Sequence, residues 1–371
     1  MILLFLSGTP FCGLSSVAEH YSNVKSSNIL VRHGLDIGGV LERLEAFART
    51  TTQRQSQPWA APEVPEWVGR SVREFGQLLV RSSVGKSEGL VVIAHPENSR
   101  HIDRLMGTFS RTSYPFKRAA YLLIVRDGLV VPRVPLGDAR SQALSGLAWA
   151  QIWASAIDPG MKQGIPVVRR EDLDESNGEM LVRLGQTQTV QQPLPQTWEN
   201  AKPGVRLTGP AAQGFAASCS ALRWMKFFGY SVPEEGVLNS QIPELVVAKA
   251  DGLIEEGALE KAAVLLSGAL AKSRHPLLLV SEGKRLASLG DEDGAMACWS
   301  ECIREESAPV AAWLLMLSRT GHAVSRDHIA RARQHPDEAV RGALARWLVA
   351  RGMDHGAAQA IAGVEGRVWS A

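Results

Sequence analysis

Four glycines recur at nearly constant spacing in the last third of the chain. Gly257, Gly290, Gly321 and Gly352 are 33, 31 and 31 residues apart, and each stands between two apolar segments with helical spacing. Glycine accepts the left-handed conformation that ends a helix, so each position predicts a helix, a turn and a second helix. Five residues after three of these glycines comes an alanine, small enough for two helices to approach closely: Ala262, Ala295 and Ala357.

A repeat of this period resembles the tetratricopeptide repeat and related α-solenoids over about residues 243–365. The full set of Trp, Leu, Gly and Tyr positions is absent, so the segment is tetratricopeptide-like rather than typical. An irregular helical bundle is the alternative. A solenoid implies a concave face that recruits a protein partner, such as an extended peptide or a helix.

Proline usage divides the chain in two. Of the 19 prolines, 16 lie at or before Pro243, and beyond it alanine becomes frequent and the pattern is helical almost without a break. The boundary is expected in the polar stretch Ser231–Gln241. We therefore predict one domain over residues 1–235 and an all-helical domain over residues 243–371, each long enough for its own core.

The first domain opens with a short apolar run, Leu3–Leu6, typical of a strand buried on both faces. It leads into a G-x-x-x-x-G spacing and then a helical segment, an order that lets backbone N–H groups surround a phosphate at a helix N-terminus. The candidate binding residues of this loop are Gly8, Thr9, Gly13, Leu14, Ser15 and Ser16. Leu14 stands where nucleotide hydrolases carry lysine, which disfavours a P-loop kinase.

The loop is similar to the 5′-phosphosulfate loop of the sulfotransferases, G-x-P-[RK]-S-G-[TS]-[TS]. The matching positions are Gly8, Pro10, Gly13, Ser15 and Ser16, whereas Phe11 and Cys12 replace the basic residue and the serine.

Later segments follow the order of that family. Residues 90–109 read as a strand, a proline and a helix, with Ala94 in the place of the family's lysine and His95 beside it. The strand that ends in Arg126-Asp127 resembles the one whose arginine binds the 3′-phosphate of the sulfate donor. Two further resemblances lie at Glu171-Asp172-Leu173 and at the segments 205–210 and 227–230, where Arg206 would serve the donor.

The resemblance implies a three-layer α/β P-loop domain with a mostly parallel sheet. It implies binding of 3′-phosphoadenosine 5′-phosphosulfate and transfer of sulfate to a hydroxyl of a carbohydrate, lipid or protein, without a metal. Arg126 and Arg206 would bind phosphate, with Ser141 or Ser145 as the partner serine. His95 would act as base or donor, since imidazole titrates in a useful range; the alternative is a surface histidine.

Two cations of the family are missing at Phe11 and Ala94. By charge alone, the candidates to replace them are Lys25, Lys86, Arg100 and Lys117. The other functional class left open is a catalytically degenerate sulfotransferase fold kept as a protein-interaction scaffold.

Composition and charge argue against some classes of protein. The 40 basic and 38 acidic residues give a net charge of +2, unlike a dedicated nucleic-acid binder. The apolar start, Met1–Leu6, is too short for a signal peptide or a membrane span, so we expect a cytoplasmic protein with no membrane span. Cys298 and Cys302 have no neighbouring histidine, which favours core packing over a metal site.

Overall fold

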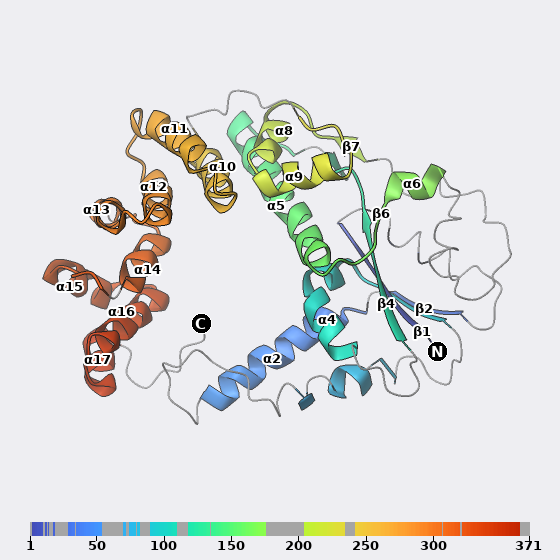
Figure 1. The fold of residues 1–371 in the computed structure, drawn as a ribbon, viewed down its shortest axis with the longest axis horizontal. Helices are drawn as coiled ribbons and strands as arrows, with labels where there is room; N and C mark the ends of the chain where they lie inside the picture. The colour runs from blue at the N-terminus through green and yellow to red at the C-terminus, as the bar shows by residue number, and fades with distance from the viewer. Residues whose placement is uncertain are drawn as a thin grey trace. The chain divides into compact units, whose positions relative to one another are not determined.

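The computed structural model places two compact units, which are described separately (Figure 1). The first comprises residues 1–48, 64–216 and 220–234, and the second comprises residues 49–63, 217–219 and 235–371. The structure describes residues 2–9, 12, 14, 18, 29–33, 35–53, 70–71, 74–78, 80–81, 90–109, 118–133, 135–175, 204–233, 242–305, 307–319 and 321–363.

A five-stranded parallel sheet forms the centre of the first unit, in the order β2-β3-β1-β4-β6. Its strands are β1 (Ile2–Gly8), β2 (Ile29–His33), β3 (Leu90–Ala94), β4 (Arg118–Val125) and β6 (Val167–Arg169). The central strand β1 pairs with β3 on one side and with β4 on the other. The prediction of a parallel sheet in an α/β fold is therefore confirmed.

The apolar run in β1 is explained by burial on both faces of the sheet. Leu4 and Leu6 belong to one buried cluster, together with Ile124, whereas Leu3 and Phe5 belong to a second on the opposite face. Successive side chains of a strand point to opposite faces, so a strand covered on both sides needs apolar residues at every position.

Helices and a small second sheet complete the first unit. The helices are α2 (Ile37–Gln53), η1 (Pro96–His101), α4 (Ile102–Phe109), α5 (Ala139–Lys162), α6 (Arg170–Glu175), α8 (Gly209–Ala216) and α9 (Cys219–Phe227). Residues 49–53 of α2 and Cys219 at the start of α9 are grouped with the second unit. Strands β5 (Val130–Val131) and β7 (Val205–Arg206) pair antiparallel. Helices α5 and α8 cross closely because Gly146 and Gly214 each face a backbone carbonyl of the other helix, where a Cβ atom would overlap it.

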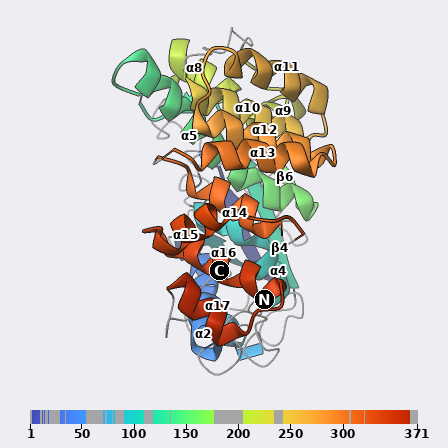
Figure 2. The ribbon, with the colours of Figure 1, turned by 90° about the vertical axis from the view of Figure 1, so that its left-hand side faces the viewer.

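The second unit is helical throughout its described part, and its helices follow one another in a row (Figures 1 and 2). They are α10 (Pro243–Glu255), α11 (Leu259–Leu270), α12 (Pro276–Ser288), α13 (Glu292–Cys302), α14 (Val310–Ser318), α15 (Arg326–Gln334), α16 (Glu338–Ala350) and α17 (His355–Ala362). Helices α10 and α11, α12 and α13, and α16 and α17 pack as successive pairs at spaced glycines, whereas α14 and α15 both pack on α16.

Three of the four spaced glycines adopt the predicted left-handed conformation. The φ angles are +75° at Gly257, +82° at Gly290 and +88° at Gly352, each between two helices. Gly321 is an exception, because its φ is not positive and it lies in a longer connection between α14 and α15. The chain already leaves the helical conformation at Arg319, so the turn there does not depend on glycine.

The prediction that a small residue follows the glycine in the helix contact is confirmed in part. Ala262 and Ala295 are fully buried, as close helix packing requires. Ala357 is exposed, and its neighbour Ala358 is buried in its place. Asp354 caps α17, and this N-terminus sets a helix register in which position 358 rather than 357 faces the core.

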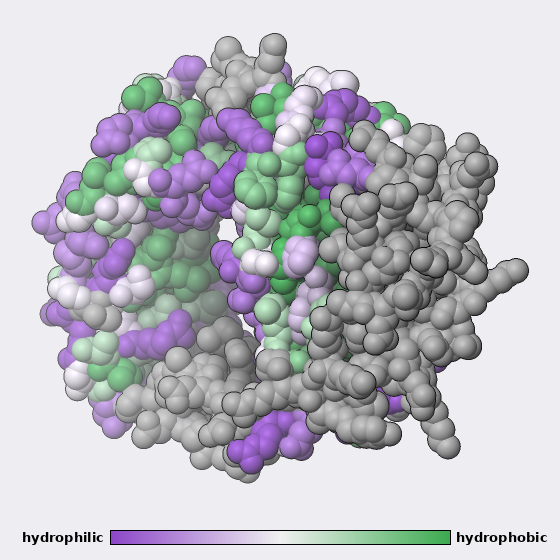
Figure 3. Space-filling model, turned by 45° about the vertical axis from the view of Figure 1, so that its right-hand side comes forward, coloured by the Kyte–Doolittle hydropathy of each residue, from purple (hydrophilic) through white to green (hydrophobic). Residues whose placement is uncertain are grey.

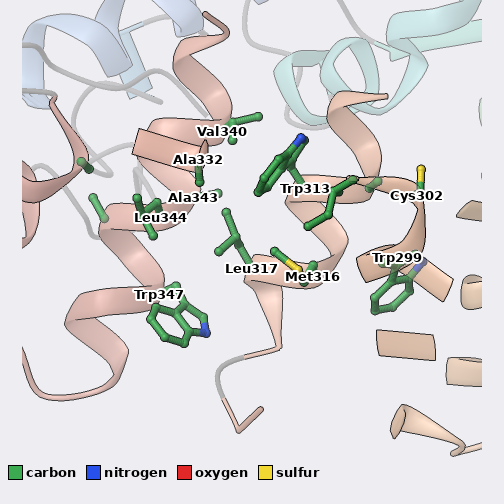
Figure 4. Close-up of a cluster of buried hydrophobic side chains, with 14 of the residues drawn as sticks. Trp299, Cys302, Trp313, Met316, Leu317, Ala332, Val340, Ala343, Leu344 and Trp347 are labelled. Carbon is green, nitrogen blue, oxygen red and sulfur yellow. The ribbon is translucent and has the colours of Figure 1, made fainter. Parts of the chain in front are cut away.

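Tryptophans are prominent in the core of the second unit (Figure 4). Trp299 is fully buried against α12, where a Cβ atom on Gly283 would overlap its indole ring. Its Nε1 donates a 3.3 Å hydrogen bond to the carbonyl of Val280. Cys302 is buried in the same cluster and its Sγ lies 3.5 Å from the carbonyl of Pro276, which agrees with core packing.

Within the described ranges, no helix combines the length and apolar character needed to cross a membrane.

Candidate functional site

Polar residues gather where the strands of the parallel sheet end. Because parallel strands all end at the same edge, residues that follow them meet there, and open α/β sheets bind ligands at this edge. The residues in these positions are Gly8 at the end of β1 and Thr9 after it, His95 after β3, Arg126 and Asp127 after β4, and Arg170 and Glu171 after β6.

Thr9 joins the ends of the two central strands. It is fully buried; its N–H donates a 3.0 Å hydrogen bond to the carbonyl of Ile124. Its Oγ1 accepts a 3.2 Å hydrogen bond from the backbone N–H of Arg126. The start of the glycine loop and the predicted phosphate-binding arginine are thus held side by side, although 117 positions separate them in sequence.

Gly8 packs too closely for any side chain. A Cβ atom there would lie 2.7 Å from the carbonyl oxygen of Ile124 and would overlap the sulfur of Cys12. This glycine therefore allows β1, β4 and the loop to approach one another, a packing role in addition to the predicted ligand-binding role.

Leu14 has a different position from the one expected of a ligand contact. It is helical, and its side chain is buried in the cluster that also contains Cys12 and Leu6. The side chain thus belongs to the core, and the backbone of Leu14 hydrogen-bonds to the Cys12 thiol. The other predicted loop residues, Gly13, Ser15 and Ser16, lie outside the described residues, as do Pro10 and Phe11.

Two guanidinium groups act on the same part of the loop. Burial raises the pKa of the Cys12 thiol to about 12, while the charges of Arg170 and Arg126 oppose this rise. The thiol is therefore neutral at ordinary pH, and both arginines are close enough to influence it. Sequence reasoning did not select Arg170, which is only 3% exposed. The available signal was an arginine directly at the end of an expected strand, before Glu171.

The backbone around Arg126 is fixed from both sides. Its carbonyl accepts a 3.0 Å hydrogen bond from Nε1 of Trp153, in addition to the N–H bond to Thr9. The next N–H, that of Asp127, donates to Oε1 of Glu171 at 3.3 Å. These contacts hold the strand end in one conformation before any ligand arrives.

Arg206 lies at the same strand end, but its charge is already balanced. It forms an ion pair with Asp127 and donates to the carbonyl and hydroxyl oxygens of Ser231 at 3.2 and 2.7 Å. Asp127 also accepts a 2.9 Å hydrogen bond from the N–H of Leu129. The predicted phosphate-binding role of Arg206 would thus require it to leave Asp127.

Glu171 connects two of the segments that resemble those of sulfotransferases. Its Oε2 accepts a 2.8 Å hydrogen bond from the hydroxyl of Tyr230, and the guanidinium of Arg169 lies 5.0 Å from the centre of the Tyr230 ring. Burial and the neighbouring carboxylate raise the pKa of Tyr230, so its hydroxyl stays protonated and acts as a donor.

His95 caps the short helix η1. Its Nδ1 accepts a 3.2 Å hydrogen bond from the backbone N–H of Glu97. The backbone N–H of His95 donates to the carbonyl of Leu6. A neutral imidazole that accepts at Nδ1 carries its proton on Nε2. The nitrogen left for a ligand is therefore a donor, which favours the predicted donor role over the base role.

The remaining predicted residues make other contacts. Both the backbone and the side chain of Ser141 hydrogen-bond to Asp138, the N-cap of α5, and this lowers the pKa of that carboxyl. Ser141 thus serves as part of a helix cap. Of the candidate replacement cations, Arg100 forms a 2.9 Å ion pair with Glu97. Lys25, Lys86 and Lys117 lie outside the described residues.

In the part of the chain that the structure describes, no three His, Cys, Asp or Glu side chains are grouped so that they could hold a metal ion. No protein-family model matches the chain, and a comparison with curated proteins finds no similar sequence.

Proposed function

We propose that the first unit binds 3′-phosphoadenosine 5′-phosphosulfate at the carboxyl edge of its parallel sheet. The observation that carries the proposal is the hydrogen bond from the Arg126 N–H to Oγ1 of Thr9, which joins the glycine loop to the strand-end arginine. In the sulfotransferases that the sequence resembles, these two elements bind the 5′-phosphosulfate and the 3′-phosphate of one donor molecule.

The charge at this edge supports an anionic ligand. Arg126 and Arg170 both act to lower the pKa of the Cys12 thiol, so two guanidinium groups lie near the start of the loop. A guanidinium is suited to a phosphate group because its planar donors can form two parallel hydrogen bonds. Arg126 also has a fixed backbone, which lowers the entropy lost on binding.

Transfer of sulfate to a hydroxyl is the second part of the proposal. In this reaction the donor's sulfur–oxygen bond to phosphate breaks and the acceptor oxygen bonds to sulfur. Adenosine 3′,5′-bisphosphate leaves, and the proton of the acceptor hydroxyl is released to solvent water. His95 would offer an N–H donor to the developing negative charge through Nε2, a type of contact whose loss costs about 3–4 kcal/mol in other enzymes.

A catalytically inactive donor-binding or scaffold protein is the second candidate, and two observations favour it. Ala94, in the place of the family's lysine, is 4% exposed and packs in a hydrophobic cluster, so this position supplies no cation. Arg206 is paired with Asp127. Binding of the donor would then persist without transfer.

Calorimetric titration with adenosine 3′,5′-bisphosphate tests the binding proposal. We expect measurable binding by the wild type and a loss of about tenfold or more for Arg126→Ala, since one charge-assisted hydrogen bond contributes about 1.5–3 kcal/mol. Arg133→Ala is the matched control, because Arg133 is an exposed arginine nearby in the sequence. Absence of binding by the folded wild type would refute the proposal, and binding without sulfate transfer to any acceptor would favour the inactive candidate.

A further inference from the structure

The second unit has an uneven distribution of charge along its row of helices. Helices α10–α13, residues 243–302, contain six Lys and Arg against ten Asp and Glu, a net charge of −4. From α14 to α17, residues 310–362, there are seven Arg against four Asp and Glu, a net charge of +3. The two halves of this unit are therefore of opposite sign.

The acidic half has a compact group of exposed carboxylates at its first turn. Glu255 and Glu256 end α10, and Glu260 begins α11, on either side of the Gly257 turn. All three are exposed, and within the described residues none of the three forms an ion pair. Glu255, Glu256 and Glu260 are called the acidic turn below.

Val264 extends the acidic turn with an apolar contact. It lies one helical turn after Glu260 on α11, and its side chain is 75% exposed. Residues four apart share a face of a helix, so this valine stands beside the carboxylate of Glu260. An apolar side chain next to acidic ones suits an arginine, whose aliphatic stem packs on apolar surface while its head remains charged.

The basic half presents an exposed arginine pair on α15. Arg326 and Arg333 are seven residues apart, which places them on one face of the helix. Both are exposed, and neither forms an ion pair with any residue that the structure describes. Arg326 and Arg333 are called the arginine face below.

A second observation shows that the surroundings of α15 are positively charged. The pKa of His328 is lowered, first by burial and then by the charges of Arg331 and Arg304, which together outweigh the opposing charge of Asp327. The guanidinium of Arg331 already has a cation–π contact, because it lies 5.8 Å from the centre of the Trp313 ring. The arginine face therefore lies in a region where added negative charge would be stabilised.

The two groups cannot neutralise each other within one chain. The α10–α11 turn and α15 lie toward opposite ends of the row of helices, in both ribbon views (Figures 1 and 2). The residues of both groups are exposed. Hydrophilic side chains are frequent on the face of the molecule that Figure 3 shows. A second copy of the chain carries an oppositely charged counterpart for each group.

We propose that the chain associates with a second copy of itself head to tail, with the acidic turn of one copy on the arginine face of the next. The contact is heterologous, because different surfaces of the two copies meet, and it can therefore continue to further copies. Exposed ion pairs contribute little individually and are screened by salt, so the association is weak and depends on ionic strength. It does not rest on the proposed function of the first unit.

Sedimentation of the full-length protein over a range of concentrations tests the proposal. At about 0.01 M salt, where the Debye length is about 30 Å, the mean mass should rise with concentration. At about 1 M salt, where this length is about 3 Å, the protein should be monomeric. A wild type that stays monomeric at low salt would overturn the proposal, even if the arginine face binds another acidic molecule.

Charge reversals identify the surfaces. Arg326→Glu/Arg333→Glu and, separately, Glu255→Arg/Glu256→Arg should each weaken self-association more than about tenfold. Mixing the two variants should restore it, because each supplies the surface that the other has lost. Arg133→Glu/Lys162→Glu, in exposed positions of the first unit, is the control with the same change of net charge as the first reversal. Folding is checked by circular dichroism, and a mixture of folded variants that remains monomeric would refute the assignment of the surfaces.

Discussion

The hydroxyl of Tyr230 donates a 2.8 Å hydrogen bond to Oε2 of Glu171, whose other oxygen accepts from the N–H of Asp127. One carboxylate thus connects the segment after α9 with the end of β4. Asp127 follows Arg126 directly, so this connection holds the strand end on which the proposed phosphate contact depends.

Tyr230→Phe removes one hydrogen bond from Glu171 and keeps the packing of the ring. We expect the free energy of unfolding to fall by about 1–2 kcal/mol, because a partly buried carboxylate loses a partner. Urea denaturation measures the change. Val264→Ala, at an exposed position, is the control and should change stability by less than about 0.5 kcal/mol; equal losses in the two variants would contradict the assigned role of the hydroxyl.

Thr9→Val keeps the shape of the side chain but removes the oxygen that accepts from the Arg126 N–H. The buried N–H is then unsatisfied, at a cost of about 1–3 kcal/mol. Thr9→Ser retains the oxygen and should keep most of the stability. The same pair of variants, titrated with adenosine 3′,5′-bisphosphate, should show weaker binding for valine than for serine if this contact positions Arg126.

Gly283→Ala should destabilise the second unit by about 1–3 kcal/mol, since the new methyl group overlaps the buried Trp299 ring. Gly268→Ala is the matched change on α11, where a Cβ atom has no atom within 4 Å. That control should be neutral or stabilising by up to about 1 kcal/mol, because alanine favours a helix. Thermal unfolding of both variants gives the comparison, and similar melting temperatures would count against the packing described for α12 and α13.

Gly290→Ala should cost about 1–2 kcal/mol, because φ is +82° and an L-residue is strained there. Gly321→Ala should have little effect, since the φ of Gly321 is not positive and the space around it is open. Denaturant unfolding distinguishes the two sites. A loss at Gly321 as large as at Gly290 would show that the third repeat turns in the same way as the others.

Burial of the Cys12 thiol makes the stability of the first unit sensitive to alkali. The pKa rises from an ordinary value near 9 to about 12 in the folded protein. The stabilising effect is therefore complete below pH 9 and is lost as the pH rises toward 12. We expect the stability of the wild type to fall more steeply above pH 9 than that of Cys12→Ala, as measured by chemical denaturation at several pH values; parallel curves would contradict the shift.

The sequence by itself predicted the elements whose cause is local. Leu3–Leu6 forms the central buried strand, as a continuous apolar run indicates. Gly257, Gly290 and Gly352 turn between helices, since the conformational freedom of glycine is a property of the residue itself. The helices of the second unit were predictable for the same reason, because periodicity and turn residues can be read from neighbours in the chain. The parallel sheet, in contrast, was expected from the family resemblance and not from a local pattern.

Only the tertiary structure decided how the polar residues are used. Thr9 meets the Arg126 N–H because the register of β1 against β4 places their ends together, a relationship that no local pattern encodes. Arg206 pairs with Asp127, 79 positions away, for the same reason, whereas His95 caps η1 through a contact only two residues along the chain. Hydrogen bonds and ion pairs act over a few ångströms, so distant segments must first be packed before their partners are determined.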